Sequence, residues 1–186
     1  MTAAPAAEPV TLAEAKAQLR VDGNAEDAYI TSLIVTSRLQ IEAALGLALM
    51  TQRWRLTLDQ WPHTGVVELP MRPVQSVQSI EIENSSGAAT VFDVAGYHVD
   101  GRAAPPRIVL NDLAPPPPER SAEGIAISFT AGFGSMAADV PAPIRQALLL
   151  LVAHWFENRE PCVGAVSPRI PDAVSTLLAP YRVVRL

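Results

Sequence analysis

Cysteine is almost absent from this 186-residue chain, which contains only Cys162. A single thiol allows no intrachain disulfide and no cysteine-based metal cluster, and we interpret it as a free thiol near a loop. Lysine is equally scarce, because Lys16 is the only one. Acidic residues outnumber basic ones by 19 to 14, giving a net charge of −5. No basic run occurs, so binding of nucleic acid through its phosphates is not expected.

The chain also lacks a leader-like beginning and a long uninterrupted hydrophobic run. Residues 1–9 are rich in alanine and proline, with neither a basic region nor an apolar one, so we expect a flexible arm over residues 1–10 and no secretory signal. The longest apolar stretch, around Leu148, is too short to cross a bilayer. With 49% hydrophobic and 18% charged residues, the chain should fold. We predict a soluble protein made in a reducing cytoplasm, without membrane contact.

Motifs of catalysis and cofactor binding are missing as well. There is no nucleophile elbow, no P-loop and no dinucleotide fingerprint, and Gly132-Phe133-Gly134 is too short to cradle a phosphate. The three histidines, His63, His98 and His154, have no metal-ligand spacing. We therefore predict no metal and no cofactor, and we interpret His154 as a core or interface residue.

One binding or enzymatic alternative stays open. Three acids could supply a carboxylate pair of the kind that glycosidases use: Glu81, Glu83 and Asp93. Three indoles could form a sugar-stacking platform: Trp54, Trp61 and Trp155. Alternating acids on a strand are more typical of a solvated face, and tryptophans at such positions more typical of core anchors. A small hydrolase or carbohydrate-binding module is thus the alternative to a non-enzymatic structural protein.

Helical patterns occupy the two ends of the chain. Thr11 and Glu14 have the spacing of a capping box and begin a short helix. A second helix is predicted between Asn24 and Gly46. Its buried stripe is predicted to contain six residues: Ile30, Leu33, Ile34, Ile41, Ala44 and Leu45. A short helix is also predicted at residues 171–178.

Between these ends the hydrophobic period changes to two, as expected for strands. Trp54, Leu56 and Leu58 alternate with polar residues. Further strands are predicted at residues 66–69, 77–83, 90–92, 97–99, 107–110 and 125–130. One apolar and one polar face indicate an antiparallel sheet with a solvated side. Pro115–Pro118 cannot donate to a sheet ladder, which predicts an exposed extended loop.

The segment 140–160 is predicted to form a helix that is apolar on nearly every side. One stripe contains Ile144, Ala147, Leu148, Leu151, Val152 and Trp155. The opposite side is also apolar, and a helix of this kind must be covered from more than one direction. In so short a chain, a neighbouring copy is a natural cover. We predict side-to-side contacts between copies through this helix and the second helix, with these inter-subunit anchors: Leu149, Leu150, Ala153, Trp155 and Phe156.

These patterns predict an α+β fold, in which the N- and C-terminal helices, about four in all, form one layer and an antiparallel β domain is inserted between them. The expected divisions are a flexible arm at 1–10, a helical pair at 11–50, the β domain at 51–136, and C-terminal helices with a tail at 137–186 that pack on 11–50. No internal repeat is present.

The chain resembles the head–tail connector, or adaptor, proteins of tailed phages and phage-like gene transfer agents. The matching pieces run in order along the chain: Val10–Lys16 with Leu19–Asp22, Glu42–Gly46 leading into Met50–Trp54, Val140–Ala147, His154–Arg159 and Leu178–Arg182. Each piece alone is weakly specific, and their shared order carries the resemblance. The long β insertion resembles the branch found in gene transfer agents and proteobacterial prophages.

The resemblance implies a structural virion protein of the neck, made in the bacterial cytoplasm, that catalyses nothing and binds no cofactor. It implies a homo-oligomeric ring, a dodecamer, seated beneath the portal protein. The ring would extend the DNA channel, with DNA passing through without specific binding, and would meet a stopper or other neck or tail protein below. Within this class, a stopper is the alternative interpretation.

The C-terminal tail is our candidate for attachment to the portal. It combines an aromatic residue, two arginines and aliphatic residues on a segment too short to fold alone. Tyrosine and arginine are frequent hot spots of protein interfaces. We therefore predict portal contacts by Tyr181, Arg182 and Arg185.

Overall fold

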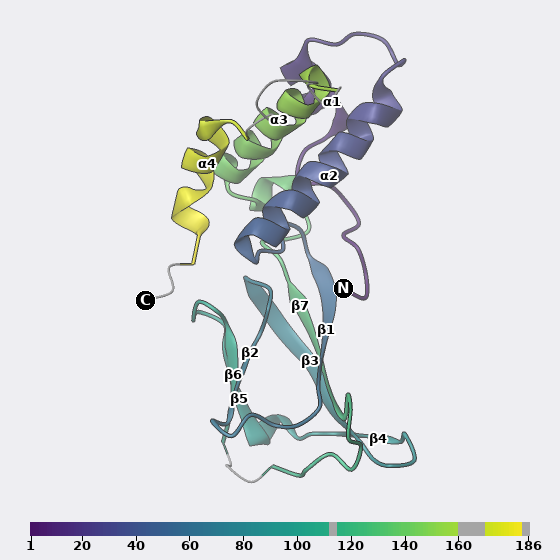
Figure 1. The fold of residues 1–186 in the computed structure, drawn as a ribbon, viewed down its shortest axis with the longest axis vertical. Coiled ribbons are helices and arrows are strands. Elements are labelled where there is room, and N and C mark those ends of the chain that lie inside the picture. The colour runs from purple at the N-terminus through teal and green to yellow at the C-terminus, as the bar shows by residue number, and fades with distance from the viewer. Residues whose placement is uncertain (112–114, 160–169, 184–186) are drawn as a thin grey trace, which may run out of the picture. The chain divides into compact units, whose positions relative to one another are not determined.

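A computed structural model describes residues 1–111, 115–159 and 170–183. Helices lie at both ends of the chain and seven strands lie between them (Figure 1). The predicted α+β class, with antiparallel strands inserted between helices, is confirmed. Contacts divide the chain into a β unit, Met1–Pro5 with Gly46–Phe133, and a helical unit, Ala6–Leu45 with Gly134–Leu186.

The β unit contains two antiparallel sheets. The first has the order β1-β7-β3-β4 and the second the order β2-β6-β5. The strands of the first sheet are β1 (Gln52–Leu58), β7 (Ile125–Ala131), β3 (Val74–Glu83) and β4 (Ala89–Val91). Those of the second are β2 (Val66–Glu68), β6 (Arg107–Leu110) and β5 (Tyr97–Asp100). At the N-terminus, the Thr2 backbone N–H donates to the Arg53 carbonyl, which places this segment beside β1.

The core of the β unit follows from the alternation of each strand. In the first sheet, Leu56 pairs with Ile127 and Ile127 with Ile80, so one face is aliphatic across three strands. The fully buried residues Phe129 and Ile108, from different sheets, belong to the same hydrophobic cluster. The opposite face of the first sheet carries polar residues, as the sequence pattern predicted.

The helical unit contains α1 (Leu12–Leu19), α2 (Asp27–Leu45), α3 (Ala142–Glu157) and α4 (Asp172–Leu178). The helix α3 packs against the other three. Three short 3-10 turns complete the chain: η1 (Val94–Gly96) in the β unit, and η2 (Ala137–Asp139) and η3 (Ala179–Tyr181) in the helical unit. Residues 8–10 also belong here, since Val10 is buried and the Pro9 carbonyl accepts a hydrogen bond from Arg145. Residues 1–10, expected to form an arm, thus contribute to both units.

The first helix begins with the predicted capping box. The Glu14 backbone N–H donates to the Thr11 hydroxyl, and the Thr11 backbone N–H donates to the Glu14 carboxylate at 2.7 Å. Arg145 of α3 forms an ion pair with the same carboxylate. The Thr11 backbone donor, the Thr11 hydroxyl and Arg145 hold the pKa of Glu14 below its ordinary value of 4.5. A single carboxylate thus caps α1 and links it to α3.

We expect the stability of the protein to depend on pH through Glu14. Because its pKa is lower in the folded state, the stability it contributes is present above pH 4.5 and is lost as pH falls through the folded-state value. Between about pH 6 and pH 3, the free energy of unfolding should therefore fall less for the Glu14→Gln variant than for the unmodified protein. Thermal unfolding at several pH values measures this. Identical pH profiles would show that Glu14 is not linked to folding.

A buried ion cluster joins α2 to the segment that precedes α1. Arg38 is only 4% exposed and donates to Glu42, also 4% exposed, at 2.8 Å. The same guanidinium donates to Glu8 at 2.7 Å. Removing one member of such a cluster leaves the other charges partly desolvated without their partner.

Arg38→Met is expected to lower the free energy of unfolding by about 3 kcal/mol or more, because Glu8 and Glu42 would lose their shared cation. Arg102→Met, at an exposed position with no ion pair in the part of the chain described, is the matched control and should change stability by about 0.5 kcal/mol at most. Urea unfolding followed by circular dichroism measures both. Equal stability of the two variants would contradict this role of Arg38.

No helix within residues 1–111, 115–159 and 170–183 is long and apolar enough to span a membrane.

Candidate functional site

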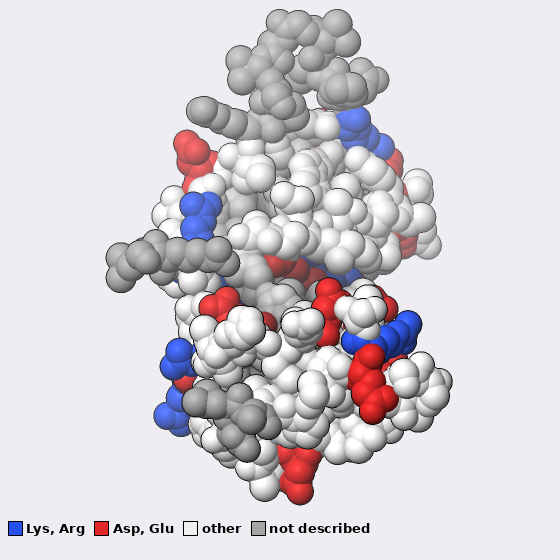
Figure 2. Space-filling model, turned by 60° about the horizontal axis from the view of Figure 1, so that its bottom comes forward, with Lys and Arg blue, Asp and Glu red and all other residues white. Residues whose placement is uncertain are grey.

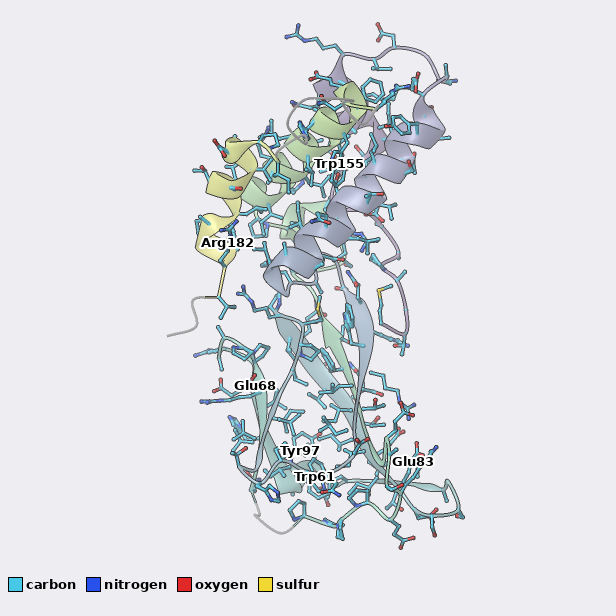
Figure 3. The ribbon with its side chains drawn as sticks, in the orientation of Figure 1. Trp61, Glu68, Glu83, Tyr97, Trp155 and Arg182 are labelled. Atoms are coloured by element: carbon cyan, nitrogen blue, oxygen red, sulfur yellow. The ribbon has the colours of Figure 1, made fainter. Side chains whose placement is uncertain are left out.

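The helix α3 has two sides of different burial. Its predicted stripe is buried in the protomer at Ile144, Ala147, Leu148, Leu151 and Val152. The five predicted inter-subunit residues are each partly exposed: Leu149, Leu150, Ala153, Trp155 and Phe156. Trp155, placed in the stripe as well, is half-buried and is labelled in Figure 3. The single protomer therefore covers one side of α3 and leaves aliphatic and aromatic surface on the other.

The exposed face of α2 carries no charged residue. Of its charged residues, Arg38 and Glu42 are buried and Asp27 forms an ion pair with Lys16 at 2.7 Å. The exposed residues are Ala28, Thr31, Ser32, Thr36, Leu39, Gln40, Ala43 and Ala44. Leu39, at 47%, is among the most exposed large apolar residues of the protein. Depletion of charge is typical of the core of a protein interface and unusual for a solvated helix.

An aromatic cluster fixes the end of α3 to the beginning of α2. The guanidinium of Arg159 lies 4.4 Å from the ring centre of Phe156 and 4.6 Å from that of Tyr29. Glu26 forms an ion pair with the same guanidinium at 2.9 Å. Phe156, one of the predicted inter-subunit contacts, therefore has packing partners within its own protomer as well as an exposed part.

Two of the three predicted portal contacts, Tyr181 and Arg182, lie in the described C-terminal part of the helical unit. Tyr181 ends η3 and is partly exposed, and Arg182 follows it and is exposed (Figure 3). Arg182 also lines a small hollow of about 70 Å³ between α2, α3 and α4, together with Ile41 and Val174. Arg185 and Cys162 lie outside the described residues.

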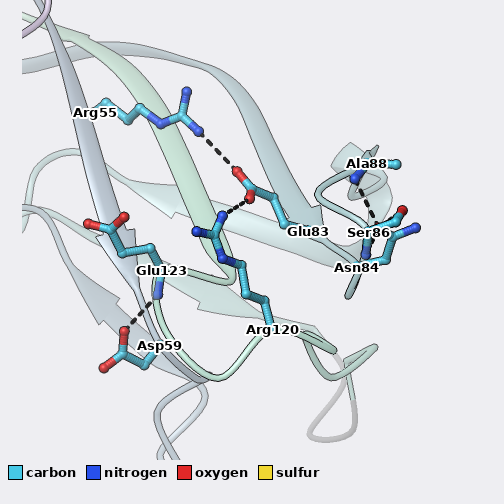
Figure 4. Close-up of polar contacts among 8 residues, drawn as sticks. All are labelled: Arg55, Asp59, Glu83, Asn84, Ser86, Ala88, Arg120 and Glu123. Atoms are coloured by element: carbon cyan, nitrogen blue, oxygen red, sulfur yellow. Dashed lines mark hydrogen bonds and ion pairs between the residues drawn. The ribbon is translucent and has the colours of Figure 1, made fainter.

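Of the three acids considered for catalysis, Glu83 and Asp93 line the same surface groove of the β unit. Glu83 forms ion pairs with Arg120 at 2.7 Å and Arg55 at 3.5 Å, which bind the loop before β7 to the sheet (Figure 4). Trp54 and Trp61 pack against the hydrophobic cluster of the β unit. His63 and His98 are exposed, and the described residues contain no group of three or more potential metal ligands. Trp54 and Trp61 thus contribute to packing, and Glu83 contributes to ion pairing.

Both a family model and solved structures match this chain. A family model described as HCP, head completion protein, matches residues 9–184. The chain belongs to the head completion protein family. Three solved structures of gene transfer agent (GTA) particles also match along the whole chain. No curated protein matches it.

Each of these three structures is covered over 97% of its own chain, and each covers 100% of this one. They are the neck of an empty GTA particle with C6 symmetry (TM-score 0.82, 28% identity), the virion of a native GTA particle (0.82, 28%) and the neck of a native GTA particle with C12 symmetry (0.80, 27%). The resemblance to head–tail connector proteins is thereby confirmed.

As a head completion protein, the chain is a structural virion protein and not an enzyme, as predicted. The hydrolase alternative is therefore set aside. On the helical unit, the protomer leaves three surfaces partly or fully exposed: one side of α3, the uncharged face of α2 and the segment after α4.

The sequence predicted contacts through α2 as well as α3, but not that the exposed face of α2 is free of charged residues. The signal was available, because Arg38 and Glu42 are four residues apart and occur at the same helical positions as the stripe residues Ile34, Ile41 and Leu45. Burial of both ions leaves the remaining face to uncharged residues. Ala44, predicted in the buried stripe, is exposed and lines a hollow with residues of α3 and α4, which corrects the prediction.

Proposed function

We propose that this head completion protein is a head–tail adaptor. Copies of it close into a ring, a dodecamer, beneath the portal protein, extend the DNA channel and join the head to the next neck or tail protein. The observation that carries this proposal is the uncovered apolar surface of the helical unit, on α3 and α2. The family match and the similarity to GTA necks with C6 and C12 symmetry support a ring in the neck of a virion.

The two helix surfaces suit a ring in which one side of each copy meets a different side of the next. Such heterologous contacts close when the rotation between copies is a fraction of a full turn. Leu149, Leu150 and Ala153 supply apolar contact area on α3, and Leu39 does so on α2. Small residues such as Ala43 and Ala44 allow a second helix to approach closely. Each contact should bury about 800 Å² per partner or more.

The charge distribution suits a channel through which DNA slides. Within the part of the chain that the structure describes, the basic side chains in ion pairs include Lys16, Arg38, Arg55, Arg107, Arg120, Arg145 and Arg159. On the face shown in Figure 2, basic side chains lie in small groups among acidic and uncharged ones and form no continuous patch. Strong attachment to DNA needs many unpaired cations that neutralise phosphates. We infer that DNA passes without specific binding.

The tail after α4 is proposed to hold the ring on the portal, through Tyr181, Arg182 and Arg185. The proposal is supported by the exposure of Arg182, which has no ion pair among the described residues. Arginine and tyrosine also often dominate the binding energy of protein interfaces.

Light scattering combined with negative-stain imaging tests the ring. The purified chain should form a ring either alone or when mixed with isolated portal rings. A chain that stays monomeric and does not bind portal would contradict the adaptor function. Binding to a preformed adaptor ring, but not to portal, would identify a stopper instead.

A further inference from the structure

The β unit exposes two large aliphatic side chains beside each other along the chain, where β4 leads into η1. Val91 is 66% exposed and Val94 is 71% exposed. The other side chains of β4 are exposed too. Single exposed aliphatic residues are common, whereas neighbouring ones beside a hollow surface indicate an interaction site.

Val91 lines a groove of about 420 Å³, which we call the β4 groove, and Val94 follows the groove residue Asp93 in the chain. The apolar part of the groove is formed by Ile82, Val91, Phe92 and Pro116. The Phe92 ring packs against two other aromatic rings, with its centre 5.5 Å from that of Trp61 and 6.2 Å from that of Tyr97. The Trp61 indole N–H donates to the Pro116 carbonyl at 2.9 Å, which fixes the proline loop as the second wall. The groove is therefore built before any partner arrives.

Two carboxylates on this groove have no cation. Asp93 and Glu119 line it and take part in no ion pair among the described residues, although Asp93 accepts the Ala95 N–H and Glu119 accepts from Ser85. Glu83, which also lines it, is already balanced by Arg55 and Arg120. The groove thus combines an apolar floor with unbalanced negative charge, which favours an apolar partner that carries a basic side chain.

The strand beside the groove can also accept backbone hydrogen bonds. The strand β4 is the last in the order β1-β7-β3-β4, and among the described residues it pairs only with β3. An edge strand of this kind binds an extended segment by strand addition, while alternate side chains of that segment enter a neighbouring pocket.

We propose that the β4 groove binds an extended segment of the next neck or tail protein, a segment in which an arginine or lysine stands between aliphatic residues. The aliphatic side chains lie over Phe92 and Val91, and the cation meets Asp93 and Glu119. This inference rests on the proposed adaptor function, since it assigns the groove to the protein that the adaptor joins to the head.

The test uses heads that carry the full-length ring but no tails, mixed with purified tails. Two double variants change this region: V91S/V94S removes the exposed methyl groups in the groove and directly beside it, and D93N/E119Q removes the two carboxylates that have no ion pair while keeping oxygen acceptors. Met136→Ser, at a residue 64% exposed in the helical unit, is the apolar control. E68Q/E123Q, at exposed acids outside the groove, is the charge control. Tail attachment is counted by electron microscopy, and the chain on the heads is quantified by immunoblot.

Both groove variants should bind to heads in normal amounts and attach tails about tenfold less well or worse, as expected for loss of interface anchors, while both controls attach tails normally. Normal tail attachment by both groove variants would overturn the inference and leave the adaptor function intact. Loss of the groove variants, but not the controls, from heads would also overturn it, since the groove would then meet the portal or a sister copy. Absence of the unmodified chain from heads would overturn the adaptor function itself.

Discussion

Leu39→Asp is expected to produce a folded protein that cannot form the ring. Leu39 is 47% exposed in the protomer, so the change should cost about 1 kcal/mol or less of the free energy of unfolding. In the proposed ring the new carboxylate would be buried against a sister copy without a cation, at a cost of several kcal/mol. Ring formation should therefore fall about 100-fold or more, as measured by sedimentation of the chain with portal rings.

The matched control for this change is Met136→Asp, which introduces the same charge at a residue that is 64% exposed and lies before α3. It should leave ring formation close to normal. Leu150→Gln, on the partly exposed side of α3, should weaken the ring in the same direction as Leu39→Asp. A Leu39→Asp protein that forms rings as well as the unmodified protein would remove α2 from the proposed contact.

A chain that ends at Pro180 is expected to fold normally and to lose attachment to the portal. The deletion removes Tyr181, Arg182 and Arg185, and it leaves α4, with the buried residues Val174 and Leu178, in place. Stability should change little, because Arg182 is exposed and Tyr181 is only partly buried. Loss of the tyrosine and arginine anchors should lower portal binding beyond detection in a pull-down with isolated portal rings.

The double variant Tyr181→Ala/Arg182→Ala distinguishes the effect of losing these two side chains from the effect of shortening the tail. It should weaken portal binding while the helix content, measured by circular dichroism, stays that of the unmodified chain. Unchanged portal binding by the truncated chain would refute the docking role of the tail.

The sequence predicted the strands well where apolar and polar residues alternate, as in β1. The predicted strand 107–110 agrees with β6, and the predicted strands 66–69 and 125–130 differ from β2 and β7 by a single residue at one end. The predicted strand 77–83 begins three residues late, because β3 starts at Val74, where Gln75 and Ser76 give no alternation of apolar and polar residues. Periodicity locates strands where burial alternates and fails where it does not.

The order of the strands is not readable from these patterns. The strand β7 lies between β1 and β3 although long segments separate it from both in the chain. This pairing depends on which aliphatic faces fit together, as for Ile127 between Leu56 and Ile80, and all the strands carry similar faces. Local sequence fixes the direction of a side chain, but not its partner strand.

The proposed contact surface was only partly predictable. Leu149 and Leu150 could be assigned to the less buried side of α3 because the helix is apolar all round. The spacing of Arg38 and Glu42 indicates that both lie on the buried side of α2, but the sequence does not show their partner Glu8, which lies 30 positions from Arg38. An ion pair in the interior contradicts the usual assignment of charged residues to the solvent side.

The most direct test of the central claim is cryo-electron microscopy of an intact particle neck with this chain located in its density. We predict a closed ring beneath the portal in which Leu149, Leu150 and Ala153 of one copy contact a neighbouring copy. A neck in which both sides of α3 are enclosed by the same protomer, with no contact to a sister copy, would contradict the proposed assembly.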